Sequence, residues 1–112
     1  MPLELRYEKC RLTAALSGEI DHHSAAFLRA QIDQALAKLR PPLLTLDFEG
    51  VTFMDSSAVG LVMGRFKALS AWEGALEVEG LSPAACRVMR LSNLHTLAKL
   101  KLKTEEKERA GV

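Results

Sequence analysis

Two serines follow an aspartate in the run Asp55-Ser56-Ser57, which lies between a short apolar segment and a stretch with helical spacing. The run therefore lies beyond the carboxyl end of a predicted strand, where α/β folds usually carry function. A hydroxyl at a helix start can cap the helix. It can also accept a phosphate, because the free amides and the positive end of the helix dipole accommodate a dianion. The residues leave both interpretations of Ser56 open.

Nucleophilic catalysis is a third possibility for Ser56. It requires a base beside the hydroxyl, and the sequence does not place His95 there. The patterns GxSxG, GxGxxG and GxxxxGK[ST] are absent. We therefore expect a protein that is not an enzyme, with no catalytic residue and no cofactor.

The candidate metal ligands are few. Of the three histidines, His22 and His23 are adjacent, so they cannot easily reach one metal ion from a regular helix. Cys10 and Cys86 form no CxxC pair, which favours two reduced thiols. We predict no metal site.

Length and charge restrict the function further. A chain of 112 residues suits one compact domain, and a net charge of +1 gives no electrostatic reason to bind nucleic acid. The amino terminus does not have the features of a signal peptide. No apolar stretch approaches the roughly 20 residues of a membrane helix. We expect a cytoplasmic protein.

Alternating residues predict strands over 3–9 and 11–17, the first with one wet face, and Gly18 ends the second. Asp21 is suited to cap a helix that ends before Pro41-Pro42. The remaining predicted elements are a strand over 43–48 covered by helices on both faces, a helix over 57–72, a strand around 76–78, a helix over 83–91 opened by Ser82-Pro83, and an edge strand over 98–103.

This order of elements predicts an α/β fold. We expect a single domain over 1–103, with a mixed, mostly parallel sheet of about five strands and three to four helices. The polar segment 104–112 is either a tail or a final helical turn.

The helix over 57–72 carries two groups of apolar residues. Leu61 and Trp72 share a face with Arg65, off the main stripe. This face either packs against a neighbouring element or forms an exposed partner-binding strip beside Ser56. The stripe predicted to be buried consists of Val59, Val62, Met63, Phe66 and Leu69.

Four short motifs occur in order along nearly the whole chain. They are Gly18-Glu19-Ile20-Asp21-His22-His23, Phe53-Met54-Asp55-Ser56-Ser57, Gly64-Arg65-Phe66-Lys67 and Leu81-Ser82-Pro83-Ala84. Each motif is weak alone, but their order and spacing together are specific. The chain resembles the STAS-domain anti-sigma factor antagonists, above all those that act in sporulation.

The resemblance implies a phosphorylation switch. In this family, the unphosphorylated protein binds an anti-sigma factor that is also a serine kinase, and binding frees the sigma factor. The kinase uses its own ATP to phosphorylate the serine after the motif aspartate, which matches Ser56. The phosphorylated form dissociates, and a PP2C-type phosphatase restores it. We expect partner contacts from Asp21, His22, Asp55, Ser57, Ala58, Leu61 and Arg65.

One departure from the family pattern concerns Ala58. Family members often carry Gly-Leu-Gly after the two serines, whereas this chain has Ala58-Val59-Gly60. Alanine favours a helix over glycine by about 1 kcal/mol. We therefore expect a stiffer helix start that changes the access of the kinase to Ser56. The alternative function is a binding module of the same fold with another partner, such as a stress-signalling scaffold or a transporter-linked domain.

Overall fold

A computed structural model describes residues 2–103, and its elements follow the predicted order. The five strands form one sheet in the order β1-β2-β3-β4-β5. A short 3₁₀ helix, η1, precedes the last strand. The elements are β1 (Leu3–Glu8), β2 (Arg11–Ile20), α1 (His22–Leu39), β3 (Leu43–Met54), α2 (Ser57–Ser70), β4 (Ala75–Leu81), α3 (Pro83–Leu91), η1 (Leu94–Thr96) and β5 (Lys99–Leu102).

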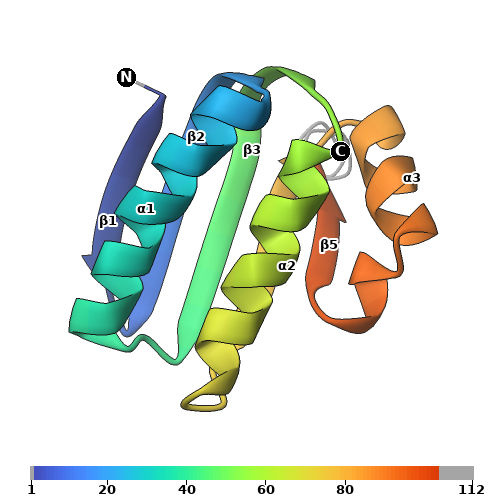
Figure 1. The fold of residues 1–112 in the computed structure, drawn as a ribbon. Helices are drawn as coiled ribbons and strands as arrows, with labels where there is room; N and C mark the ends of the chain where they lie inside the picture. The colour runs from blue at the N-terminus through green and yellow to red at the C-terminus, as the bar shows by residue number, and fades with distance from the viewer. Residues whose placement is uncertain (1, 104–112) are drawn as a thin grey trace, which may run out of the picture.

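The sheet confirms the predicted mixed topology. β1 is antiparallel to β2, and the pairs β2–β3, β3–β4 and β4–β5 are parallel. α1 and α2 lie side by side against one face of the sheet, and α3 lies beside β5 (Figure 1). The α/β fold with five strands and three α-helices is therefore confirmed.

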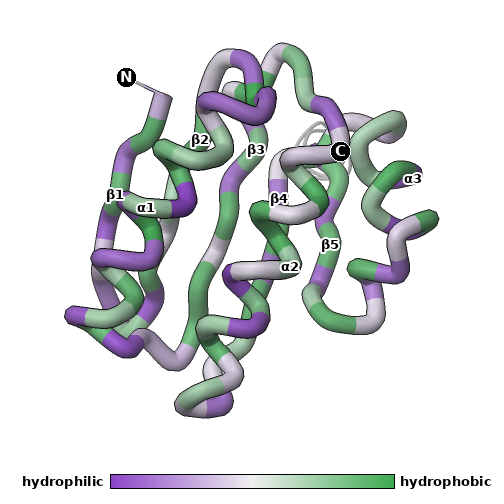
Figure 2. Tube along the Cα trace, in the orientation of Figure 1, coloured by the Kyte–Doolittle hydropathy of each residue, from purple (hydrophilic) through white to green (hydrophobic). Residues whose placement is uncertain are grey.

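The turn between β1 and β2 uses residues that do not favour it. Lys9 and Cys10 both have left-handed backbone conformations, with φ of 51° and 63°. A two-residue hairpin turn needs positive φ because its twist must match that of the strands. β1 alternates between hydrophilic and hydrophobic residues (Figure 2). Leu5 and Tyr7 nevertheless stay exposed because this edge strand is covered only in part.

β2 and β3 are both longer than predicted. β2 continues through Gly18, whose φ is +80°, to Ile20. β3 does not stop at Phe48 but continues to Met54, because the added part of β2 pairs with it. Two register shifts interrupt this pairing, which explains why the sequence pattern breaks there.

α1 and α2 cover one face of the sheet, and a helix over the other face of β3 stays a prediction. Leu44 and Leu46 face the helices, whereas Thr45 lies on the opposite face. There the hydroxyl of Thr45 donates to a carboxylate oxygen of Glu77 at 3.5 Å, and the other oxygen lies 3.4 Å from Lys101. On that face these side chains form polar pairs between neighbouring strands, and both Thr45 and Glu77 are buried.

The buried face of α2 is rotated from the predicted stripe. Val62 and Leu69 are buried as predicted, but Met63 is 40% exposed, and Val59 and Phe66 are only partly buried. The residues that α2 buries are Ala58, Leu61, Val62, Arg65 and Leu69.

The two predicted caps are confirmed. Asp21 accepts a hydrogen bond from the Ser24 amide at 2.9 Å, and Ser82 accepts one from the Ala85 amide at 3.1 Å. Pro83 occupies the first turn of α3, as predicted. The segment 104–112 lies outside the described residues. In the part that is described, none of the helices has the length and apolarity to cross a membrane.

Candidate functional site

The starts of α1 and α2 lie together at one end of the sheet. The Asp55 amide donates to the Ile20 carbonyl at 3.2 Å, so the ends of β3 and β2 are joined immediately before both helices begin. Asp21 precedes α1, and Ser56 precedes α2. The sheet therefore places two regions that resemble the family motifs side by side, although they are distant in sequence.

Asp21 lies at the start of α1 in a capping box. Its carboxylate accepts from the Ser24 amide, and the Ser24 hydroxyl accepts from the Asp21 amide. The pKa of the Asp21 carboxyl is lowered, mainly because the bond from the Ser24 amide stabilises its charged form.

Asp21→Ala is expected to lower the Tm at pH 7 by a few degrees through loss of the cap. Because the folded-state pKa is lowered, the stabilisation is present above the ordinary value near pH 4 and is lost as the pH falls through the folded pKa. Thermal unfolding of both proteins between pH 3 and 7 measures this. A Tm difference that stays constant over that range would show that the charge of Asp21 is not involved.

Asp55, not Ser56, caps α2. The Asp55 carboxylate accepts from the Ser57 amide at 2.8 Å. Ser56 already has helical dihedral angles, φ −62° and ψ −14°, and its hydroxyl makes no capping hydrogen bond. The capping interpretation of Ser56 is therefore wrong. Ser56 is exposed, so its hydroxyl is available for another role, while Ser57 is half-buried.

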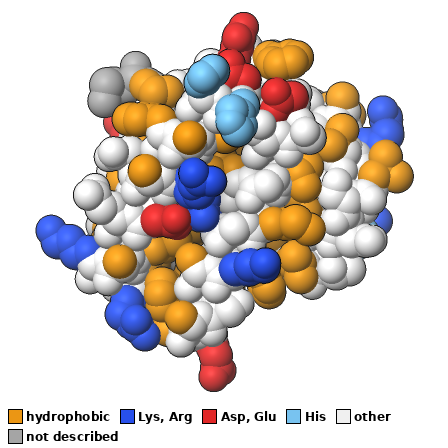
Figure 3. Space-filling view, viewed as in Figure 1, with side chains coloured by type: hydrophobic (Ala, Val, Ile, Leu, Met, Phe, Trp, Pro, Cys, Tyr) orange, Lys and Arg blue, Asp and Glu red, His pale blue; other side chains and the backbone are white. Residues whose placement is uncertain are grey.

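His22 and His23 are exposed at the start of α1, with their rings edge to face and their centroids 5.9 Å apart. Histidine and acidic side chains gather at this end of the molecule (Figure 3). Residues 2–103 contain no group of three or more His, Cys, Asp or Glu side chains that could hold a metal ion. His95 lies in η1, a separate element.

Of the two interpretations of the α2 face that carries Leu61 and Arg65, packing against a neighbouring element is confirmed and the exposed strip is wrong. Leu61 is 3% exposed and Arg65 4% exposed, because this face of α2 packs against α1. Arg65 pairs with Asp33 of α1, with its Nε 2.8 Å from the carboxylate. Trp72 lies beyond the carboxyl end of α2, where its indole donates to the Pro41 carbonyl at 2.7 Å. Packing against α1 and the segment before β3 therefore explains why these residues are apolar or paired.

Ala58 is completely buried in the first turn of α2. Its methyl group therefore faces the core and is not available to a partner in this conformation. The replacement of the family glycine by Ala58 therefore changes the stability of the first turn of α2 and not the surface that a partner meets. Among the residues expected to contact a partner, Ala58, Leu61 and Arg65 are thus inside the domain, whereas His22 and Asp55 are exposed.

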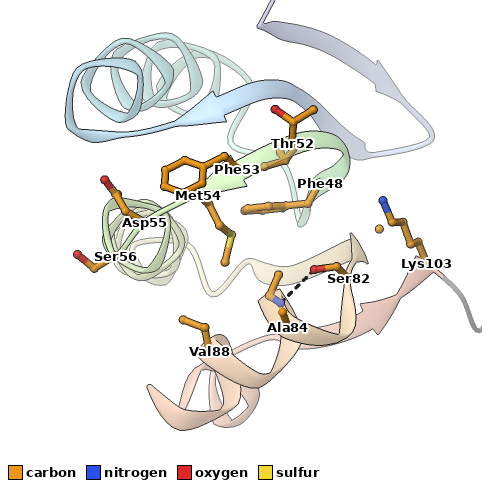
Figure 4. Close-up of a pocket in the computed structure, with 13 residues that line it drawn as sticks. Phe48, Thr52, Phe53, Met54, Asp55, Ser56, Ser82, Ala84, Val88 and Lys103 are labelled. Atoms are coloured by element: carbon orange, nitrogen blue, oxygen red, sulfur yellow. Dashed lines mark hydrogen bonds between the residues drawn. The ribbon is translucent and has the colours of Figure 1, made fainter.

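A groove of about 370 Å³ begins at Ser56 and runs between β3 and α3 (Figure 4). Gly80 of β4 is among its lining residues and packs closely against β3, since a Cβ at this position would lie 2.6 Å from the Glu49 amide nitrogen. The sequence does not predict the groove, because its pattern predicts a loop, not a strand, at Phe53 and Met54. The side chains at its walls and ends include Phe48, Phe53, Met54, Asp55, Ser56, Ala84, Val88 and Lys103.

Comparison with known proteins places this site in context. Residues 6–108 match the family model of the STAS domain. An anti-sigma F factor antagonist from Paenibacillus polymyxa is 31% identical over 84% of this chain and 80% of its own length. Another, from Lysinibacillus sphaericus, is 39% identical over 70% of this chain and 68% of its own length.

Solved structures agree with the sequence comparison. The anti-sigma factor antagonist SpoIIAA in its unphosphorylated form has a TM-score of 0.77 and 31% identity, over 98% of this chain and 97% of that one. The phosphorylated form of the Bacillus cell fate determinant SpoIIAA has a TM-score of 0.72 and 31% identity, over 96% of this chain and 98% of that one. The motifs, the fold and these relatives agree: the chain belongs to the STAS domain family, and its relatives are anti-sigma factor antagonists.

Proposed function

We propose that this protein is a cytoplasmic anti-sigma factor antagonist controlled by phosphorylation of Ser56. In the unphosphorylated state it binds an anti-sigma factor that is a serine kinase, and this binding releases the sigma factor. Phosphorylation by that kinase, with ATP bound to the kinase, ends the interaction. A PP2C-type phosphatase removes the phosphate and restores binding.

The observation that carries this proposal is the exposed, uncommitted hydroxyl of Ser56 at the start of α2. Because Asp55 already caps the helix, modification of Ser56 removes no capping bond. The first amides of α2 and the positive end of its dipole favour an added negative charge. A phosphate is therefore compatible with the fold, and it changes the charge of the surface that a partner meets.

The relatives also support an antagonist rather than a scaffold or a transporter-linked module. Those of 31% and 39% identity are named anti-sigma F factor antagonists, and SpoIIAA is described in both unphosphorylated and phosphorylated forms. We extend this property to Ser56 because its geometry fits a phosphoacceptor. His22 and Asp55, both exposed, are proposed contact residues at this end of the sheet, together with Asp21 and Ser57 at the two helix starts.

Incubation with the anti-sigma factor kinase from the same cell and ATP tests the site. Intact mass spectrometry is expected to show one added phosphate on the wild-type protein, with fragmentation placing it on Ser56. Ser56→Ala is expected to show none, whereas Ser70→Ala, the control at an exposed serine at the other end of α2, still gains it. Phosphate on Ser56→Ala at the wild-type rate would show that the acceptor is elsewhere.

A further inference from the structure

The groove beside Ser56 exists because β3 extends beyond its neighbour. β4 pairs with β3 only as far as the pair Asp47–Glu79. From Gly50 to Met54, β3 pairs with β2 on one side, and within the described residues no strand pairs with it on the other side. α3 forms the opposite wall there, so a channel remains between a strand edge and a helix.

The walls of this groove expose large apolar side chains. Phe53 on β3 is 56% exposed and Val88 on α3 is 42% exposed, whereas Phe48, which also lines the groove, is buried. Figure 4 shows Met54 and Val88 directed toward the space between the two elements. Exposed apolar groups that line a concave surface are typical of binding sites.

One end of the groove lies at Ser56, the proposed phosphorylation site. Ser56 and Asp55 line the groove themselves, while Lys103 lies at its other end. A protein that brings a kinase active site onto the Ser56 hydroxyl must therefore cover at least this end of the groove. The occupant most consistent with this continuity is a part of that same protein.

We propose that the groove binds a short apolar segment of the anti-sigma factor, with Phe53 and Val88 as its two contact walls. This inference rests on the proposed function and adds a docking surface to it. An apolar segment seated here covers the rim where Ser56 lies. A phosphate on Ser56 then loses water without gaining a partner, which opposes binding.

Charge substitutions on the two walls test the inference, because both side chains are exposed enough to be replaced without burying a charge. Phe53→Lys and Val88→Lys are each expected to raise the Kd for the unphosphorylated complex at least tenfold. Leu91→Lys is the matched control, since Leu91 lies on the same helix, is 79% exposed and is outside the groove. Its Kd is expected to stay within twofold of wild type.

The Kd of each variant for the purified anti-sigma factor kinase is measured by isothermal titration calorimetry in the presence of ADP. Circular dichroism first shows that the fold of the variant is unchanged. One outcome overturns the groove inference and leaves the proposed function standing. In it, the wild type binds the kinase and Ser56→Asp binds more weakly, but Phe53→Lys and Val88→Lys bind within twofold of the wild type. If the wild type does not bind, both fail. The inference is also overturned if the groove variants keep the wild-type Kd for the kinase but have a different oligomeric mass in light scattering of the isolated protein. That result would assign the groove to self-association.

Discussion

Ser56→Asp is expected to raise the Kd for the anti-sigma factor kinase about 10–100-fold, whereas Ser56→Ala keeps it within about twofold of wild type. Ser56 is exposed and makes no capping bond, so neither change removes an interaction that holds α2. The difference between the variants therefore reports the cost of covering a negative charge at this position. Titration calorimetry of both variants measures it.

Ser70→Asp is the control for charge alone, because Ser70 is exposed at the opposite end of α2. Its affinity for the kinase is expected to match the wild type. Equal binding by Ser56→Asp and Ser56→Ala would mean that the partner does not cover Ser56. A loss of affinity in Ser70→Asp as large as that in Ser56→Asp would instead indicate a general effect of net charge.

Asp33→Ala is expected to destabilise the protein by about 2–3 kcal/mol, and Arg65→Met by less than about 1 kcal/mol. Burial lowers the pKa of Arg65, and Asp33 counteracts this by favouring the charged guanidinium. Removing the carboxylate leaves a buried cation without its partner, whereas methionine fills similar space without a charge. The expected cost is below that of a fully buried pair because the Asp33 side chain is 43% exposed.

Urea unfolding of the wild type and the two variants measures these free energies. Gln34→Ala, an exposed neighbour on α1, is the control and is expected to stay within about 0.5 kcal/mol of wild type. A larger loss in Arg65→Met than in Asp33→Ala would contradict the argument, because the ion pair would then contribute more than the desolvation of Arg65 costs.

Local chemistry predicted the helix starts and the order of elements. Asp21 and the pair Ser82-Pro83 were recognised from residue type alone, since a cap depends only on the few amides that follow it. The edge strand β5 and the parallel strands also follow from alternation and element order. These features depend on residues that are near one another in sequence, and for that reason they could be predicted.

The rotation of α2 could not be predicted from α2 alone. A charged residue such as Arg65 is assigned to the wet face of a helix unless its partner is known, and Asp33 is on another helix. The burial of Leu61 and the exposure of Met63 follow from the same rotation. The sequence left packing and an exposed strip open for this face, and it could not decide between them because this long-range pair was not visible.

The extension of β3 was missed for a related reason. Glu49 and Gly50 interrupt the apolar run, and the strand continues because β2 pairs with it and not because its residues alternate. Phe53 therefore lies on an exposed strand segment, although the sequence pattern indicated a loop. The groove beside Ser56 depends on this extension, so neither its walls nor its continuity with Ser56 could be inferred from the sequence.

The most direct test of the phosphorylation switch follows one protein through modification and reversal. The wild-type chain is phosphorylated by the kinase, its phosphate is located on Ser56, and its Kd for the kinase is measured before phosphorylation, after it, and again after treatment with a PP2C-type phosphatase. The switch predicts a Kd at least about 100-fold higher in the phosphorylated state and full recovery after phosphatase treatment. An unchanged Kd in the protein phosphorylated on Ser56 would contradict it.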